Sequence, residues 1–92
     1  MPTSGQPRPT PRVTIYTTPM CHWCRVAKAY FAEHGVHYSE VDVASDRRGL
    51  REMVLMTGGR AVPVVRVAER AMVGWDVAEF ERLYRGGDFR RR

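Results

Sequence analysis

The hydrophobic period of the chain changes sharply at Pro19. Before this proline, residues 13–18 alternate apolar and polar side chains and are rich in β-branched residues, which is typical of a strand. After it, residues 22–34 place apolar side chains at three- and four-residue intervals, as on one face of a helix. The sequence therefore predicts a strand that leads directly into a helix, and both cysteines of the chain, Cys21 and Cys24, lie at this junction.

The rest of the chain predicts five further elements. Strands are expected at residues 36–43, 62–67 and 71–73, and helices at residues 46–57 and 77–85. Ser45 or Asp46 can cap the first of these helices, and Asp76 with Glu79 forms a capping box for the second. Glycines follow the three predicted helices, at Gly35, Gly58-Gly59 and Gly86-Gly87. The order β-α-β-α-β-β-α indicates an α/β domain in which the first two strands are parallel and the last two form an antiparallel hairpin.

Two segments flank this domain, which is expected to span residues 13–87. Residues 1–12 contain four prolines and almost no apolar side chain, so we predict a disordered or polyproline-like arm, and residues 88–92 form a basic tail. The net charge of +5 comes from the two ends, because nine basic and nine acidic side chains balance between residues 13 and 84. This neutral body argues against a nucleic-acid partner, although the basic ends leave an acidic partner open.

The composition also indicates the cellular setting. No apolar run approaches the ~18 residues that a membrane-spanning helix needs. The N-terminal residues include Pro, Thr, Ser, Gln and Arg but lack the apolar stretch of a secretory signal. A short secreted domain would more often carry several cysteines at wider spacing. We therefore expect a soluble, cytoplasmic monomer without a membrane partner.

The spacing of Cys21 and Cys24 allows metal binding, redox chemistry or coincidence. Structural zinc needs four ligands, usually from two such pairs, and this chain has one pair with His22 poorly placed between its members. The first-turn amides of a helix lack internal partners and carry partial positive charge, so they would stabilise a thiolate at Cys21. Cys24 lies nearly one turn further in and can reach a mixed disulfide on Cys21. We predict that Cys21 is the nucleophile and Cys24 the resolving thiol.

Three segments of the chain resemble the glutaredoxin family, in the family's order and spacing. They are the strand and Thr-Pro-Met-Cys-His-Trp-Cys segment at residues 13–24, the Arg-Ala-Val-Pro segment at residues 60–63 and the Val-Gly-Trp-Asp turn at residues 73–76. The resemblance covers residues 13–85 and implies a thioredoxin fold, a four-stranded mixed sheet with three helices, with the site at one end of the sheet. It also implies that the peptide bond between Val62 and Pro63 is cis and that Pro63 faces the cysteines.

Two family features that bind glutathione are altered in this chain. Glutathione-binding glutaredoxins usually carry a lysine three residues before the nucleophile, where this chain has Thr18. They usually carry a Gly-Gly-(Cys/Ser)-Asp turn, where this chain has Gly74, Trp75 and Asp76. The Gly-aromatic turn is more similar to NrdH-type redoxins, which donate electrons to ribonucleotide reductase or other disulfides and are often reduced by thioredoxin reductase. The backbone of Val62 and the carboxylate of Asp76 could still contact glutathione.

Three ring side chains near the cysteines have two interpretations each. In the first interpretation of His22, its protonated ring favours the Cys21 thiolate; in the second, His22 is only a solvated side chain at a helix start. Trp23 either shields the disulfide and meets a partner protein, or packs on the helix. Trp75 lies, by the resemblance, where the chain of a partner would run, or it covers the end of the sheet.

We therefore predict a dithiol thiol–disulfide oxidoreductase that uses Cys21-His22-Trp23-Cys24 to reduce protein disulfides, with ribonucleotide reductase among the candidate substrates. The residues expected to contact a substrate or partner are His22, Trp23, Val62, Pro63, Gly74, Trp75 and Asp76. No metal and no obligatory cofactor are expected, and the reductant would be thioredoxin reductase or glutathione. Two other hypotheses stay open: a glutathione-dependent glutaredoxin able to carry a [2Fe–2S] cluster, and a non-catalytic adaptor that acts through the arm and the tail.

Overall fold

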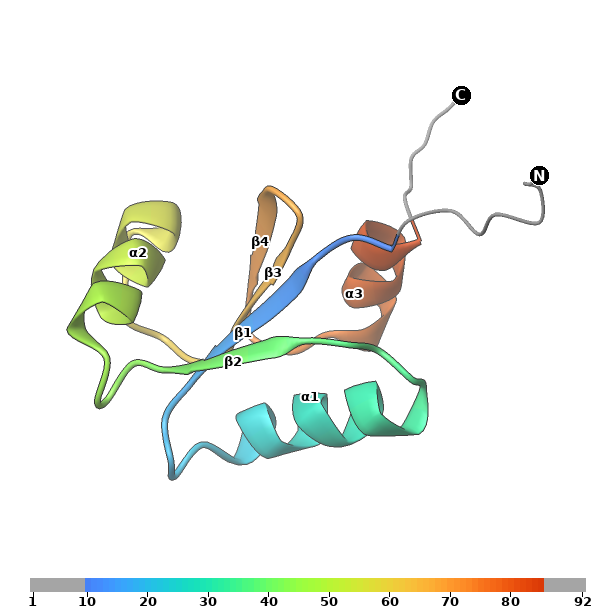
Figure 1. Ribbon diagram of the computed structural model, residues 1–92, viewed down its shortest axis with the longest axis horizontal. Coiled ribbons are helices and arrows are strands. Elements are labelled where there is room, and N and C mark those ends of the chain that lie inside the picture. The colour runs from blue at the N-terminus through green and yellow to red at the C-terminus, as the bar shows by residue number, and fades with distance from the viewer. Residues whose placement is uncertain (1–9, 86–92) are drawn as a thin grey trace.

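The computed structural model describes residues 10–85 and contains seven elements in the predicted order (Figure 1). They are β1 (Val13–Thr17), α1 (His22–Glu33), β2 (Ser39–Asp42), α2 (Arg47–Thr57), β3 (Val64–Val67), β4 (Arg70–Val73) and α3 (Val77–Tyr84). Most of the predicted arm, the Gly86-Gly87 helix end and the predicted tail at residues 88–92 lie outside the described residues. Within residues 10–85, no helix is both long enough and apolar enough to cross a membrane.

The four strands form one mixed sheet in the order β2-β1-β3-β4. β1 pairs with β2 in parallel and with β3 in an antiparallel ladder, and β3 pairs antiparallel with β4, as the β-α-β unit and the hairpin predicted. These directions bring the C-terminal ends of β1, β2 and β4 and the N-terminal end of β3 to one edge of the sheet. The segments that lead into all three helices therefore leave from this edge.

Helices cover both faces of the sheet, and each face has its own core. α1 and α3 cover one face, where Phe31 of α1 and Phe80 of α3 are fully buried against Ile15 and Val65 of the sheet. α2 covers part of the other face, where Met53 packs with the second cluster of buried side chains, namely Tyr16, Val43 and Val64. Successive side chains of a strand point to opposite faces, so β1 contributes alternately to the two cores.

Two predicted strands start too early, because one backbone N–H is bonded elsewhere and another is missing. Residues 36–38 do not extend β2, because the N–H of Val36 donates to Phe31 O at 2.9 Å and closes the end of α1. Gly35, with φ +66°, takes the predicted left-handed conformation in this closing turn. β3 begins at Val64 rather than at residue 62, because Pro63 has no N–H to donate to a ladder. β4, in contrast, begins one residue earlier than predicted, at Arg70.

Two aspartates cap the helices that begin near the site edge. Asp46, rather than Ser45, is the cap of α2, and its Oδ1 accepts from Gly49 N at 2.8 Å. Asp76 caps α3, and its Oδ1 accepts from the N–H groups of Ala78 at 2.9 Å and Glu79 at 3.3 Å. Both caps satisfy amides that have no partner within the helix, which defines where the two helices start.

Gly49 shows how closely α2 approaches the sheet. This glycine is buried in the first turn of α2, and a Cβ atom added to it would overlap Cγ1 of Val41, which comes from β2. The same Cβ would lie 3.2 Å from Cγ of the capping residue Asp46. The missing side chain therefore allows the capped turn to lie directly against β2.

We expect the substitution Gly49→Ala to destabilise the protein, although alanine favours a helix over glycine by about 1 kcal/mol. The added methyl group must displace the stiff, β-branched side chain of Val41, and overpacking of this kind costs about 1–3 kcal/mol, so the expected net loss is up to about 2 kcal/mol. Urea denaturation measures it, with Arg48→Ala, at an exposed position in the same turn, as the matched control. Equal stability of the two variants would contradict the close approach of α2.

Candidate active site

Cys21 is the N-cap residue of α1, as the junction of strand and helix predicts. Its backbone is extended, with φ −94° and ψ 112°, and its Sγ accepts a hydrogen bond from the backbone N–H of Cys24 at 3.1 Å. The sulfur thus occupies the position that a serine or aspartate oxygen takes at other helix starts. An amide at the positive end of α1 therefore contacts the sulfur that the sequence predicts to be the nucleophile. That this sulfur is a thiolate stays a prediction.

The two cysteines differ in their exposure to solvent. The Cys21 side chain is partly exposed, whereas Cys24 is buried with 1% of its surface accessible, and both thiols are free. Burial and a hydrogen bond to the Cys21 side chain raise the pKa of Cys24 to about 12. At neutral pH Cys24 is therefore a protonated thiol that lies directly behind the accessible sulfur of Cys21.

The predicted loop at Val62 and Pro63 lies at the same edge of the sheet as the cysteines. The peptide bond between these residues is cis, as the resemblance implied. Because Tyr16 pairs with Val64, the register places Pro63 opposite Thr17, at the end of β1 that leads to Cys21. That Pro63 faces the sulfur atoms stays a prediction, which this register supports.

The turn after β4 joins this edge through the backbone. The N–H of Gly74 donates to Pro63 O at 2.8 Å, and Gly74 has φ +88°, a conformation that glycine adopts without strain. The Asp76 side chain is exposed and caps α3 with one oxygen, which leaves acceptor capacity on its carboxylate. The segment that begins at Gly74 therefore lies beside the Val62-Pro63 loop.

Trp75 packs into the aromatic core rather than standing free beside the cysteines. Its ring centroid lies 5.4 Å from those of Tyr30, Phe31 and Phe80, and the side chain is half-buried. The structure therefore supports the interpretation in which Trp75 covers the end of the sheet. A contact between its remaining exposed surface and a partner stays a prediction.

An exposed apolar surface lies next to Cys21 in the chain. Met20 is 87% exposed and Trp23 is 56% exposed. The rings of His22 and Trp23 form an edge-to-face contact, with their centroids 5.1 Å apart. The sequence interpretation assigned Met20 nothing beyond local packing, whereas the structure turns its side chain into solvent. Exposed large apolar side chains beside a reactive group are typical of a surface that meets another protein.

The structure also places a polar network behind the cysteines that the sequence interpretation missed. Lys28 Nζ lies 2.9 Å from Glu40 Oε2, and the same oxygen accepts from Thr17 Oγ1 at 2.8 Å. Lys28 is the single lysine of the chain and follows Cys24 by four positions, which places both on one side of α1. This spacing was visible in the sequence, but the pairing with Glu40 depends on how β2 packs beside β1.

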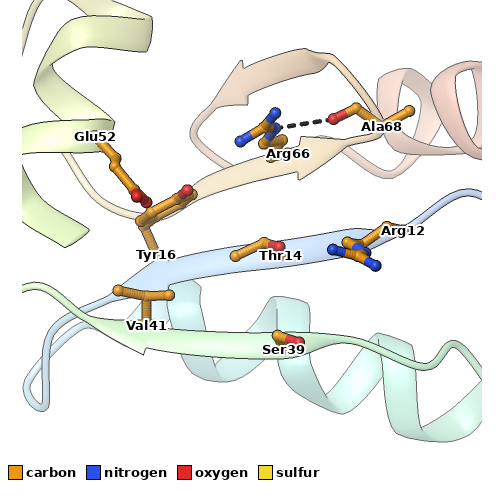
Figure 2. Close-up of a pocket in the computed structure, with 8 residues that line it drawn as sticks. All are labelled: Arg12, Thr14, Tyr16, Ser39, Val41, Glu52, Arg66 and Ala68. Atoms are coloured by element: carbon orange, nitrogen blue, oxygen red, sulfur yellow. Dashed lines mark hydrogen bonds between the residues drawn. The ribbon is translucent and has the colours of Figure 1, made fainter. Parts of the chain in front are cut away.

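A groove of about 340 Å³ crosses the α2 side of the sheet, away from the cysteines (Figure 2). Its lining comes from β1, β2, β3, α2 and the adjoining loops, and includes Arg12, Thr14, Ser39, Glu52 and Arg66. Figure 2 shows Arg66 Nε donating to Ala68 O, at 2.9 Å, along one wall. Neither cysteine lines the groove, and between residues 10 and 85 no three His, Cys, Asp or Glu side chains are grouped closely enough to hold a metal ion.

Comparisons with known proteins agree with this geometry. The glutaredoxin family model matches residues 13–72. A glutaredoxin-like 8.6 kDa protein from a rubredoxin operon of Clostridium pasteurianum is 32% identical over 71 residues, which cover 77% of this chain and 95% of that protein. The glutaredoxin-like protein NrdH of Lactococcus lactis is 28% identical over 71 residues, which cover 77% of this chain and 97% of NrdH.

Solved structures support the fold independently of close sequence similarity. The crystal structure of a glutaredoxin from Archaeoglobus fulgidus superimposes with a TM-score of 0.74 at 18% identity, over 83% of this chain and 88% of that one. The four-stranded mixed sheet with its three helices is thus a thioredoxin fold. The chain, with its cysteine pair at the start of α1, belongs to the glutaredoxin family of thiol–disulfide oxidoreductases.

Proposed function

We propose that this protein reduces disulfides of other proteins through a dithiol mechanism in which Cys21 attacks and Cys24 resolves. The observation that carries this proposal is the pairing of an accessible N-cap sulfur, held by a helix amide at 3.1 Å, with a buried, protonated thiol behind it. Such a pair provides one nucleophile and one delayed nucleophile, which is what a two-step reduction needs.

In the first step, the Cys21 thiolate attacks one sulfur of the substrate disulfide. The substrate S–S bond breaks, a mixed disulfide forms between Cys21 and the substrate, and the other substrate sulfur leaves as a thiolate that takes a proton from solvent. The amide of Cys24 holds the attacking sulfur in place before the reaction. The partial exposure of Cys21 gives the substrate access.

In the second step, Cys24 loses its proton and attacks the Cys21 sulfur. A disulfide forms between Cys21 and Cys24, the bond to the substrate breaks, and the second substrate thiol is released, so the substrate gains two electrons and the protein loses two. A reductant must then restore both thiols of the protein. No cofactor of this chain enters either step.

The surface around Cys21 favours a protein substrate over glutathione adducts. Met20 and Trp23 present apolar side chains to solvent, and Trp75 closes the end of the sheet. Thr18 stands where glutathione-binding relatives usually carry a lysine. The similarity to NrdH makes ribonucleotide reductase a candidate substrate and thioredoxin reductase the first candidate reductant. Glutathione is the alternative reductant, because the exposed carboxylate of Asp76 is able to accept from its ammonium group.

Serine substitutions test the assigned roles of the two thiols. We expect Cys21→Ser to lose insulin disulfide reduction entirely, because a serine hydroxyl remains protonated and does not attack disulfides. Cys24→Ser should instead accumulate a mixed disulfide with its substrate, since the resolving thiol is missing, and mass spectrometry detects this species. Full insulin reduction by Cys21→Ser would refute the proposal.

Alkylation at different pH values tests the protonation state of Cys24. The raised pKa of Cys24, about 12, keeps this thiol protonated at the assay pH of about 7.5. Iodoacetamide should therefore modify Cys21 alone in the reduced protein. Modification of Cys24 should increase only as the pH rises toward 12, as long as the fold persists. Peptide mapping after each reaction assigns the label, and equal labelling of both cysteines at neutral pH would contradict this order.

The reductant can be identified by coupling the oxidised protein to two purified systems. We expect NADPH consumption with thioredoxin reductase to exceed that with glutathione and glutathione reductase by about tenfold or more. The reason is that the glutathione contacts are weakened at Thr18 and at the Gly74-Trp75 turn, and a loss of about 1.4 kcal/mol corresponds to a tenfold lower rate. Cys21→Ser serves as the control in both systems. A faster reaction with glutathione would assign the protein to the glutathione-dependent branch of the family while leaving the dithiol chemistry intact.

A further inference from the structure

Lys28 connects the helix that carries the cysteines to the two strands beneath it. It lies on α1 one turn beyond Cys24, and its ammonium group donates to Glu40 on β2 at 2.9 Å. The Glu40 carboxylate also accepts from the buried Thr17 of β1 at 2.8 Å. The Lys28 side chain is 31% exposed, so most of it is shielded from water, and its ammonium group is held by a carboxylate that Thr17 in turn fixes.

The charge of Lys28 acts on the thiol that is hardest to ionise. Burial raises the pKa of Cys24 most strongly, whereas the backbone of Thr18 and the charge of Lys28 lower it. Besides Cys24, the charged or titratable groups that act on Lys28 are Glu40 and Tyr38, which come from β2 and the segment before it. The thiolate of Cys24 would therefore form beside one fixed positive charge.

We propose, on the basis of the dithiol function above, that Lys28 held by Glu40 and Thr17 promotes the resolving step by stabilising the Cys24 thiolate. Lys28 acts through Cys24 and touches no substrate, so it is a positioning residue. In this step the Cys24 proton passes to solvent, the new Cys21–Cys24 bond forms as the bond to the substrate breaks, and the departing substrate thiolate takes up a proton. Lys28 keeps its own proton throughout.

The ion pair itself does not titrate in the range where thiols are assayed. The hydrogen bond between the two side chains raises the pKa of Lys28 above its ordinary value of 10.5 and lowers the pKa of Glu40 below 4.5. Lys28 therefore stays protonated and Glu40 ionised across neutral pH. Rates measured at one pH near neutrality are therefore compared with both partners of the pair charged.

The two-phase reaction with dithiobis-nitrobenzoate (DTNB), an aromatic disulfide, separates the two cysteines. Attack by Cys21 releases the first coloured thiolate, and attack by Cys24 on the mixed disulfide releases the second. Loss of the Lys28 charge by Lys28→Met should leave less Cys24 thiolate at a fixed pH of about 7.5. If the thiolate falls about tenfold, the greater nucleophilicity of the more basic thiolate regains about threefold, so the second phase should slow about threefold while the first phase keeps its rate.

Three variants distinguish a charge effect from a structural one. Lys28→Arg should restore the second phase to within about twofold, because the positive charge is kept. Arg51→Met, which removes the same charge from an exposed position on α2, should match the wild-type protein in both phases. Lys28→Gln, with a polar side chain, repeats the test if the methionine variant does not fold.

The outcomes separate this inference from the function on which it rests. Release of only one equivalent of coloured thiolate, or of none, by the wild-type protein would overturn both. Two normal phases in the wild-type protein and in Lys28→Met, with the same rates, would overturn the role of Lys28 alone. Equal slowing of both phases, or failure of Lys28→Arg to restore the second, would show that Lys28 only ties α1 to the sheet, and would also overturn its role in the resolving step.

Discussion

The pairing of β1 with strands on both sides is the constraint on which the rest of the structure depends. Parallel pairing with β2 requires the connecting chain to cross the face of the sheet, and α1 is that crossing. Antiparallel pairing with β3 brings the cis Val62-Pro63 bond to the end of β1. Because Val13, Ile15, Tyr16 and Thr17 are all buried, β1 cannot shift its register without exposing a core side chain. The position of Cys21 at the start of α1 follows directly from this strand.

A difference in burial makes two identical thiols chemically distinct. Cys21 is the N-cap, where solvent and the helix amides both reach its sulfur, whereas Cys24 faces the core one turn later. The helix amide donates to the first sulfur, and burial raises the pKa of the second. In the mechanism that we propose, the burial that preserves Cys24 for the second step also slows that step, and the charge of Lys28 reduces this cost. In that mechanism the network with Glu40 and Thr17 belongs to the chemistry of the site as well as to its packing.

Local signals in the sequence predicted the elements well, and failed where a strand-like segment lacks a backbone N–H that is free to pair. The β-branched alternation of β1, the Asp76 cap of α3 and the left-handed Gly35 each depend on a few neighbouring residues, and each was predicted. Residues 36–38 read as strand because Val36 and Tyr38 alternate with polar residues, yet Val36 closes the helix end instead. The start of β3 was placed too early because Val62 resembles a strand residue while Pro63 removes the donor that pairing needs.

The sequence by itself determined that the cysteine pair lies at a helix start, because the change of hydrophobic period at Pro19 is a local signal. The difference in exposure between the two sulfurs depends on how α1 packs against the sheet. Only the tertiary structure decided what surrounds the pair. Glu40 meets Lys28 from 12 positions away and Thr17 from 23, so their network exists only once β2 has paired with β1. Trp75 likewise joins Tyr30, Phe31 and Phe80 only when α3 packs beside α1, and this contact, which no local pattern encodes, buries part of a ring expected to face a partner.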